Sequence, residues 1–388
     1  MSVPLNVGFG LLTLFPGRVG GSETYVRGLL ERFAEHEGPE RFTVLANRHV
    51  ADAYAELARG PVALHEVSSY RPGNRPPTRA LAMAKARIAP GRAARDVPGD
   101  LDLLHLPVTV PIPEIELPRV VTLHDVAHLD LPRVFSRAQR RYRRWAYDGS
   151  ARRANLVVTV SEFSRQRIVE RLGVAPERIA AIPHGIDHAT FAPASDESGP
   201  VVSGLPERYL LYPANLWPHK NHLRLLDALA AVNDPDLHLV LTGQIYGRLR
   251  TVVAHARRRG LRSRLHHLGH IPRERLAALY RRATAMVFPS LYEGFGQPPL
   301  EAMACGCPVA ASDRGAVAEV CGEAALGFDP DDVDSIAGAV GRVAGDEALR
   351  ARLREAGMAR AAEFSWERSA AAHLEVYRRV ADGYPALP

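Results

Sequence analysis

The sequence predicts an α/β protein made of two doubly wound parallel-sheet, or Rossmann-like, domains. Three observations predict this fold class. Short apolar runs rich in Val, Leu and Ile alternate with helical stretches along most of the chain. The runs lack polar alternation, which is typical of strands covered on both faces. A stretch rich in Pro, Ser, Gly and acidic residues interrupts the alternation near the middle of the 388 residues, so we expect two domains and a linker.

The first domain is predicted to cover residues 1–188. Its candidate strands are 5–11, 42–46, 63–67, 101–106, 120–124, 156–160 and 179–182, and its clearest helices are 22–36, 137–153 and 161–172. The segment 73–100 is rich in Pro and Arg and poorly patterned apart from a short Ala-rich helical piece. Two interpretations of it stay open, a mobile excursion near the ligand and a plain surface loop.

The linker is predicted at 189–206 and the second domain at 207–366. The candidate strands here are 209–213, 238–242, 265–268, 286–289, 309–311 and 326–328, and the helices are 221–231, 248–259, 273–282, 297–305, 333–345 and 347–364. Ligands of open parallel sheets bind at the carboxyl ends of the strands. We therefore expect a site in a cleft where these edges of the two sheets face each other.

The composition excludes several classes of protein. Hydrophobic residues make up 46% and charged residues 24%, as in ordinary globular domains. The amino end lacks a basic stretch followed by a long apolar run, and no segment reaches about 18 uninterrupted apolar residues. We therefore expect neither a signal peptide nor a membrane span, and a cytoplasmic location. Three cysteines close together without metal-ligand spacing predict reduced thiols.

The charge balance is basic, with a formal net charge of +6 and a pI near 9.4. Nearly all of the basic residues are arginine, because Lys85 and Lys220 are the only lysines. No zinc finger, RNA-binding aromatic motif or basic zipper accompanies this charge, so nucleic acid is not expected as a partner. The stretch 133–153 carries arginines at 133, 137, 140, 141, 143, 144, 152 and 153. Such a helix is either a solvated face or a basic surface for anionic lipid or polysaccharide, so peripheral association with the inner face of a membrane stays open.

The stretch Glu293-Gly-Phe-Gly-Gln-Pro-Pro-Leu-Glu301 is the most informative part of the chain. The apolar run before it predicts a strand and Gln297 begins a helix, so the loop between them is a ready-made anion site. Glu301 is expected in the first helical turn, where the helix dipole alone favours an acid. The complete string of acid, glycines, prolines and acid is harder to explain by capping. It suits a ligand with a phosphate between two polyols, such as a nucleotide sugar.

Other candidate residues follow neighbouring predicted strands. Lys220 lies in a loop before a helix, where a solvated lysine would oppose the helix dipole, so phosphate binding explains it better. Gly20 and Gly21 open a helix and would let the backbone approach an anion, although any tight turn could use them. His124 ends a predicted strand, a position equally compatible with a structural and a functional histidine. For the segment 184–187 we expect a structural role.

These motifs resemble those of a large family of retaining glycosyltransferases called family four, or glycosyl transferases group one, whose fold is of the GT-B type. The similarity is strongest between Tyr209 and Val320, in Pro-His-Lys-Asn, in Glu-Gly-Phe-Gly with its second Glu, and in Ala311-Ser-Asp-Arg-Gly. The closing Phe364-Ser-Trp-Glu-Arg resembles the last element of the family. This resemblance implies that the helix within 367–388 crosses back onto the first domain.

The resemblance implies a role for each matched residue. Catalytic roles fall to His124 beside the reacting sugar, Lys220 on the diphosphate and Glu293 on the donor sugar hydroxyls. Glu301 would accept hydrogen bonds from the paired ribose hydroxyls, and the backbone amides of 294–296 would surround sugar and phosphate. The donor-binding set is Gly20, Gly21, Asn215, His219, Gly294, Phe295, Gly296 and Glu301.

Some positions depart from the family pattern. Many relatives carry arginine where His219 and Asn215 stand. Neutralisation of the diphosphate would then rest more heavily on Lys220, or on an arginine elsewhere such as Arg248. Gly315-Ala316 also replaces a double glycine.

The activity implied by the resemblance is transfer of a hexosyl group from a nucleoside diphosphate sugar to an acceptor hydroxyl with retention of configuration. The acceptor would be a glycan, a lipid-linked glycan or a small molecule. No Asp-x-Asp motif sits in a suitable place, so neither a metal nor another cofactor is expected. Two alternatives stay open: a sugar-nucleotide epimerase or phosphorylase on a related scaffold, and a non-catalytic nucleotide-sugar binding protein.

Overall fold

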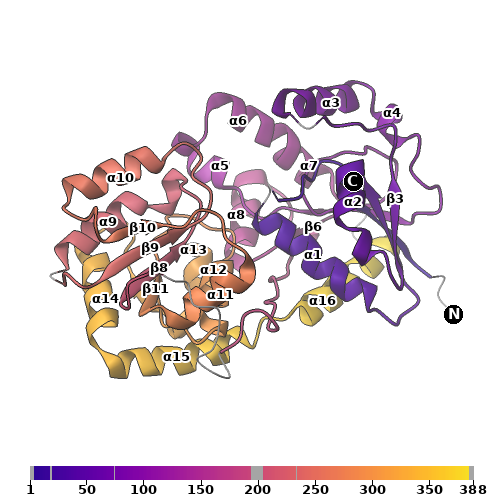
Figure 1. Cartoon of the computed structure of the whole chain (residues 1–388). Coiled ribbons are helices and arrows are strands. Elements are labelled where there is room, and N and C mark those ends of the chain that lie inside the picture. Colours follow the sequence, from indigo (N-terminus) through magenta and orange to yellow (C-terminus); the bar gives the residue numbers. More distant parts are fainter. Residues whose placement is uncertain (1–3, 18–19, 74, 194–203, 233, 384–388) are drawn as a thin grey trace. The chain divides into compact units, whose positions relative to one another are not determined.

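The computed structural model describes residues 4–17, 20–73, 75–193, 204–232 and 234–383 (Figure 1). It divides into two compact units. The first is Met1–Gly185 together with Trp366–Pro388, and the second is Ile186–Ser365. The last helix, α16 (Trp366–Ala381), therefore packs with the first unit although it follows the second in the sequence.

The first division falls after Gly185, three residues before the predicted boundary at 188. The segment that follows Gly185 bonds to the second unit. The amide of Ile186 donates to the carbonyl of Phe364 at 3.2 Å, and the guanidinium of Arg281 donates to the carbonyl oxygens of Thr190 and Ala192 at 3.0 and 2.7 Å. Residues 194–203, the larger part of the predicted linker, lie outside the described residues.

The described residues of the first unit form a seven-stranded parallel sheet of order β3-β2-β1-β4-β5-β6-β7. Its strands are β1 (Asn6–Gly10), β2 (Arg41–Ala46), β3 (Val62–Glu66), β4 (Leu103–Leu106), β5 (Arg119–Thr122), β6 (Leu156–Thr159) and β7 (Ile179–Ala181). The order reverses between β1 and β4. In open α/β sheets, ligands bind outside the carboxyl ends of the strands at such a switch point.

The second unit has the same design. In the described residues its six parallel strands have the order β10-β9-β8-β11-β12-β13, with the switch point between β8 and β11. They are β8 (Tyr209–Pro213), β9 (His238–Thr242), β10 (Leu265–His267), β11 (Ala285–Phe288), β12 (Val309–Ser312) and β13 (Leu326–Phe328). All thirteen predicted strands are therefore found within two residues of their expected ends, and the predicted fold class is confirmed.

Helices connect the strands in both units. Those of the first unit are α1 (Gly21–Ala34), α2 (Arg48–Ala53), α3 (Pro76–Ile88), α4 (Pro90–Ala94), α5 (Ala127–Asp130), α6 (Arg137–Arg143), α7 (Gly149–Arg153), α8 (Glu162–Leu172) and α16, with short turns η1 (Ala55–Leu57), η2 (Pro132–Val134) and η4 (Pro176–Arg178) and a π-helical segment η3 (Arg144–Asp148). Those of the second unit are α9 (His222–Ala231), α10 (Leu249–Arg258), α11 (Arg273–Arg282), α12 (Gln297–Ala304), α13 (Gly315–Cys321), α14 (Val333–Gly345) and α15 (Glu347–Ala361), with η5 (Pro218–Lys220) and η6 (Gly322–Ala324).

The described residues of the segment 73–100 are more helical than the short Ala-rich piece that the sequence predicts. They form α3 and α4 and are tied back to the end of β3 by Asp96. The carboxylate of Asp96 accepts hydrogen bonds from the Ser68 hydroxyl at 2.8 Å and the Ser69 amide at 2.7 Å. The poor sequence pattern has a physical cause, because α3 leaves Leu81 and Ile88 exposed instead of burying one clean apolar face.

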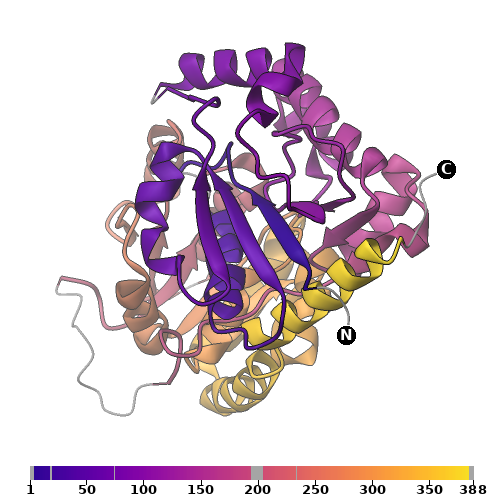
Figure 2. The same ribbon diagram turned by 90° about the vertical axis from the view of Figure 1, so that its right-hand side faces the viewer.

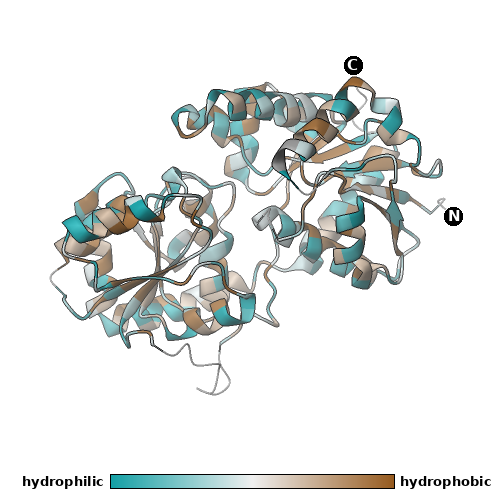
Figure 3. Cartoon of the chain, turned by 45° about the horizontal axis from the view of Figure 1, so that its top comes forward, coloured by the Kyte–Doolittle hydropathy of each residue, from teal (hydrophilic) through white to brown (hydrophobic). Residues whose placement is uncertain are grey.

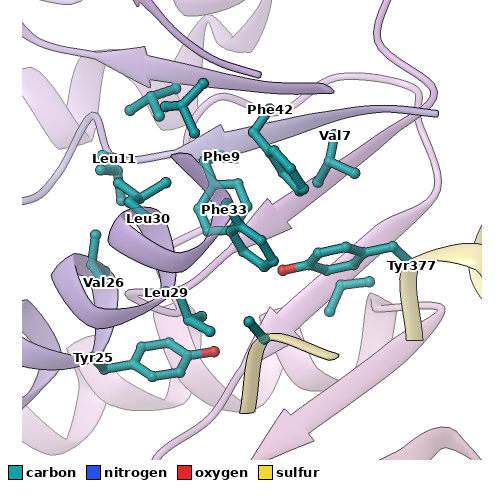
Figure 4. Close-up of a cluster of buried hydrophobic side chains, with 14 of the residues drawn as sticks. Val7, Phe9, Leu11, Tyr25, Val26, Leu29, Leu30, Phe33, Phe42 and Tyr377 are labelled. Atoms are coloured by element: carbon teal, nitrogen blue, oxygen red, sulfur yellow. The ribbon is translucent and has the colours of Figure 1, made fainter. Parts of the chain in front are cut away.

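The core of the first unit forms between the sheet and α1. The rings of Phe9, Phe33 and Phe42 contact one another, and Phe33 and Phe42 stack at 4.2 Å between centroids (Figure 4). Tyr377 of α16 points into the same cluster (Figure 4). Strand residues are mostly hydrophobic while helices alternate (Figure 3), as expected when a sheet is covered on both faces.

Helix α16 lies beside the first sheet (Figure 2), and a buried chain of hydrogen bonds joins the two. Its links join Tyr377 to His105 Nδ1 (2.8 Å), His105 Nε2 to Thr122 (2.7 Å), Thr122 to Tyr25 (2.8 Å), Tyr25 to His373 Nε2 (2.7 Å) and His373 Nδ1 to the Ser369 carbonyl (2.7 Å). Burial lowers the pKa of His373 to about 4 and that of His105 well below its ordinary value, so both rings are neutral at pH 7.

The carbonyl of Ser369 at one end of this hydrogen-bond chain determines which group donates the proton in every other link. A carbonyl can only accept, so Nδ1 of His373 donates and its Nε2 accepts from Tyr25. The Tyr25 oxygen then accepts from Thr122, whose oxygen accepts from Nε2 of His105. Nδ1 of His105 is left to accept from Tyr377. All of these buried donors and acceptors are satisfied by this one order, which requires both neutral rings.

Gly28→Ala is expected to destabilise the first unit. A Cβ at Gly28 would lie 2.2 Å from the ring of Trp366, the first residue of α16, and an indole ring cannot yield within a packed core. Replacing glycine by alanine within a helix otherwise stabilises it by ~1 kcal/mol. A net loss of about 1–3 kcal/mol in the free energy of unfolding would therefore come from the clash with Trp366. Urea unfolding measures the change.

Gly338→Ala is the matched control, because Gly338 is an exposed helical glycine of α14 with nothing within 4 Å of its Cβ position. This variant should gain stability. Equal behaviour of the two variants would contradict the packing described for Trp366.

Candidate active site

Lys220 and Glu293 form an ion pair at the switch point of the second sheet. Lys220 lies in the loop after β8, and Glu293 lies in the loop after the neighbouring strand β11. The ammonium nitrogen of Lys220 is 2.5 Å from Oε1 of Glu293, and both side chains are about one-sixth exposed. Phe288, the last residue of β11, places its ring 5.7 Å from the same nitrogen. Two loops far apart in sequence thus bring a cation and an anion to the edge where ligands of this fold bind.

The loop turn around Lys220 is held by backbone geometry. Asn221 adopts the left-handed conformation with φ 62°, and its side-chain Nδ2 donates to the carbonyl of Pro330 at 2.6 Å. The hydroxyl of Tyr212 donates to the carbonyl of Lys220 at 2.7 Å. These bonds fix the backbone on both sides of the ammonium group, so only its flexible stem remains to be oriented.

Helix α12 begins directly after the glycine loop. Gln297 is its first residue, and Pro298 and Pro299 follow, where their missing N–H groups would have no helical partner in any case. The side chain of Phe295 is 6% exposed and contacts Phe364 at 5.9 Å between ring centroids. The ring of Phe295 therefore packs in the core. Only the backbone of Phe295 remains a candidate for ligand binding.

Glu301 is buried, with 8% of its surface exposed. It is the fifth residue of α12 and so lies in the second turn, which corrects the expectation of a first-turn acid favoured by the helix dipole. Burial raises its pKa to about 7, while Arg273 and hydrogen bonds from Gln297 and Tyr280 act in the opposite direction. A buried carboxyl with a raised pKa destabilises the folded protein when it ionises. Acids with perturbed pKa values of this kind concentrate at functional sites.

Other residues near Lys220 either hold the neighbouring loops in place or add positive charge. The side-chain oxygen of Asn215 accepts from the amide of Gln244 at 2.8 Å, so Asn215 holds the loop after β9. The carbonyl of His219 accepts from the amide of Leu291 at 2.8 Å and so joins the two loops. Arg248 has no carboxylate within 4.0 Å among the described residues. Burial, together with the charges of Lys220 and Arg248, lowers the pKa of His222 to about 3, so both cations lie near this loop.

In the first unit, Gly20 and Gly21 precede or begin α1. Gly20 has φ 64°, a conformation that favours glycine, and no atom of the described residues lies within 4 Å of a Cβ at either position. A ligand could therefore approach this backbone closely. The pair lies after β1, which borders the switch point of the first sheet.

His124 follows β5 and is partly buried. Its Nε2 lies 3.3 Å from the carbonyl of Pro107, so Nε2 carries the proton and Nδ1 is an acceptor. Burial lowers its pKa, although Asp125 and the Pro107 carbonyl raise it. A neutral ring at pH 7 follows, and it can accept a hydrogen bond from a hydroxyl group.

Sequence reasoning missed the two rings that enclose His124. Tyr25 meets His124 edge-on at 5.1 Å, and His184 meets it at 5.6 Å between centroids. His184 also stacks on Tyr25 at 5.0 Å and on Trp366 at 5.9 Å, which agrees with a structural role for this segment. In the sequence, only the position of Tyr25, one helical turn after Gly21, could have suggested that Tyr25 lies near His124.

Sequence models of two families match the chain. Residues 197–360 match "Glycosyl transferases group 1", and residues 19–190 match "Glycosyltransferase Family 4". O-antigen chain mannosyltransferase B of Escherichia coli is 34% identical over 268 residues, which are 67% of this chain and 70% of that protein. The chain belongs to glycosyltransferase family 4.

This family-4 enzyme has further relatives of known name. A mannosyltransferase of Mycolicibacterium hassiacum, named MMP alpha-(1->4)-mannosyltransferase, is 30% identical over 78% of this chain and 75% of that protein. Membership of the family confirms the resemblance and the predicted activity, glycosyl transfer from a nucleotide sugar. It disfavours both the epimerase or phosphorylase and the non-catalytic binding protein.

Solved structures agree with the fold. Sucrose-phosphate synthase from Thermosynechococcus elongatus is 22% identical and superposes with a TM-score of 0.80 over 98% of this chain and all of that chain. The Anabaena protein HepE, solved in complex with UDP and glucose, is 20% identical with a TM-score of 0.73 over 96% of this chain and 99% of that chain. These similarities confirm the predicted GT-B fold.

Glu301→Gln is expected to stabilise the ligand-free enzyme at pH 8 and to do so far less at pH 5. The native state holds the carboxyl proton more tightly than the unfolded chain, because the pKa rises from 4.5 to about 7 on folding. The stability of this group is therefore full below pH 4.5 and is lost as the pH rises through 7, a difference of about 3 kcal/mol. Urea unfolding at the two pH values measures it.

The same variant separates a functional acid from a structural one. A ligand-binding Glu301 should give up stability in exchange for affinity, so the glutamine variant should bind a nucleotide sugar more weakly while being more stable. An equal gain at both pH values, or unchanged donor affinity, would contradict this assignment.

Proposed function

We propose that the enzyme transfers a hexosyl group from a nucleoside diphosphate sugar to an acceptor hydroxyl with retention of anomeric configuration. The observation that carries the proposal is the Lys220–Glu293 pair beside the start of α12, at the switch point of the second sheet. Lys220 binds the diphosphate, Glu293 binds donor sugar hydroxyls, and Glu301 accepts hydrogen bonds from the ribose hydroxyls. Gly20 and Gly21 line the acceptor side of the phosphates, and His124 lies beside the reacting sugar.

The chemistry requires a site that stabilises growing negative charge on the leaving diphosphate. A preorganised cation does this best in a partly dehydrated setting, because it needs no reorientation as the charge develops. Lys220 and Arg248 supply positive charge near one loop, and the amides that begin α12 add the helix dipole. The departing phosphate takes the acceptor proton, so Glu293 acts by binding and not as a nucleophile.

Independence from metal ions stays part of the proposal. Among the described residues, no group of three or more His, Cys, Asp or Glu side chains is arranged to hold a metal ion. The three cysteines are free and buried, and burial raises the pKa of the Cys305 thiol to about 12. We assign stabilisation of the leaving-group charge to Lys220 and the backbone amides that begin α12.

A screen of nucleotide sugars tests the activity directly. Two relatives are named mannosyltransferases, so a nucleoside diphosphate mannose is the first donor, and UDP-glucose is the second. The expected result is nucleotide release that depends on an added acceptor. The anomeric NMR signal of the product should show the same anomeric configuration as the donor sugar. Inversion of configuration, or nucleotide release that no acceptor accelerates, would overturn the proposal.

Lys220→Ala is expected to lower kcat/KM by ~10²–10³, the effect of removing one preorganised charge stabiliser. Steady-state nucleotide release measures it. The double variant Lys220→Glu with Glu293→Lys is the control, since it keeps an ion pair of the same two groups in reversed order. If the pair were only structural, the double variant would recover activity; we expect that it recovers stability but not turnover.

The acceptor is proposed to be presented at a membrane or on a lipid carrier. In the described part of the chain no helix has the length and hydrophobicity needed to cross a membrane. Helices α3 and α6 instead carry exposed apolar side chains, Leu81 (55%), Ile88 (84%) and Tyr142 (39%). Neither helix contains an acidic residue, and both are rich in Arg or Lys. Apolar side chains within a basic surface favour the interface of an anionic bilayer.

Leu81→Ser combined with Ile88→Ser is expected to weaken binding to vesicles that contain phosphatidylglycerol by about tenfold or more, because the variant loses most of the apolar area that would enter the bilayer. Co-sedimentation measures the bound fraction. Ile245→Ser removes an apolar side chain of similar exposure (42%) in the other unit and should leave binding unchanged. Equal binding to purely zwitterionic vesicles would contradict the role of the basic residues.

A further inference from the structure

A hollow of about 690 Å³ lies at the amino ends of β5, β6 and β7. Arg119 begins β5, and Asn155 and Arg178 immediately precede β6 and β7. Ile115, Leu117 and Pro118 form an apolar wall. The volume is that of a small-molecule site. This edge of the sheet is opposite to the carboxyl ends of the strands, where His124 lies, so the hollow is separate from the proposed machinery.

Four arginines line the hollow: Arg119, Arg152, Arg153 and Arg178. None of them has a carboxylate oxygen within 4.0 Å among the described residues. Arginines of the adjacent helix α8 behave differently, since Arg167 and Arg171 both pair with Asp130. The hollow therefore concentrates positive charge that no ion pair among the described residues neutralises.

Backbone carbonyls orient these guanidinium groups. Arg119 donates to the carbonyl of Ile115 at 2.6 Å, and Arg178 donates to the carbonyls of Arg152, at 3.0 Å, and Ala154. Carbonyl partners fix the planes of the side chains without cancelling their charge. The Nε atom of Arg178 is buried and has no hydrogen-bond partner in the part of the chain that the structure describes. A buried donor without a partner is uncommon and is explained if a ligand supplies the acceptor.

The electrostatics favour an anion. Burial lowers the pKa of Arg119, Glu114 raises it, and the nearby charge of Arg153 lowers it again. Glu114 and Glu116 are exposed on the rim, where water screens them, and they offset only half of the four positive charges. Planar guanidinium groups match the geometry of phosphate oxygens.

We propose that this hollow binds a small organic phosphate, with the phosphate on the arginines and the organic part against the wall of Ile115, Leu117 and Pro118. It is a second ligand site on the first unit, at the opposite end of the strand that leads to His124. The site does not depend on the donor assignment, because it shares no residue with Lys220, Glu293 or Glu301.

Calorimetry with phenyl phosphate tests the site, using full-length Lys220→Ala protein so that binding at the proposed donor site does not contribute. We expect saturable binding that is tighter than that of inorganic phosphate. Arg152→Gln combined with Arg153→Gln should weaken it about 10- to 100-fold, the effect of removing charge-assisted hydrogen bonds. Both residues are exposed at the end of α7, so the fold should survive, and circular dichroism checks this.

Two further variants make the outcome decisive. Glu116→Gln removes a rim carboxylate and should tighten binding about two- to fivefold, a gain that misfolding cannot produce. Arg48→Gln, an exposed arginine elsewhere in the first unit, should leave binding unchanged. Absence of saturable binding, or equal effects of the Arg48 and Arg152/Arg153 variants, would overturn the proposal. Equal affinity for inorganic and phenyl phosphate would overturn the assignment of the apolar wall.

Discussion

The buried chain of hydrogen bonds from Tyr377 to Ser369 is the interaction on which the first unit depends. It crosses between α16, β4, β5 and α1, so four elements distant in sequence share one set of protons. Because each link has only one allowed direction, removal of any member leaves a buried donor or acceptor unpaired. That loss is larger than the net contribution of a single hydrogen bond. The return of the chain end onto the first unit is therefore specific.

The same chain reaches the candidate active site through Tyr25. The Tyr25 hydroxyl is bonded to Thr122 and His373, and its ring lies against His124. The last helix of the chain thus orients Tyr25, which lies near the amino end of the sequence. In this way the closing helix contributes through Tyr25 to the position of His124, which is a reason for the enzyme to keep a polar network where apolar packing would be simpler.

Most of the fold was predictable because the strands are buried on both faces. A continuous apolar run in a parallel sheet leaves little ambiguity, and the thirteen strands were found where expected. The short helices α2, α5 and α13 were not predicted, because pieces this short lack a helical period. The helix α3 was predicted only as a short Ala-rich piece, because its exposed apolar side chains obscure the helical period. Lys220, Glu293 and Glu301 were found as candidates from their loops. Their geometry was not, since the burial of Glu301 against Arg273 and Tyr280 arises from packing between α11 and α12.

A structural explanation of the Lys220–Glu293 pair is weak on physical grounds. Partly buried ion pairs add little to stability, because the loss of hydration offsets most of the attraction, and well-packed apolar residues serve equally well. Arginine, with its fork of donors, is also the better choice for a fixed pair with a carboxylate, and this chain uses arginine at nearly every other basic position. Lysine keeps its charge on a flexible stem that can leave one anion for another. A diphosphate that enters between the two loops would take the ammonium from Glu293 and release that carboxylate to accept hydrogen bonds from sugar hydroxyls, so a single exchange of partners prepares both residues for the donor.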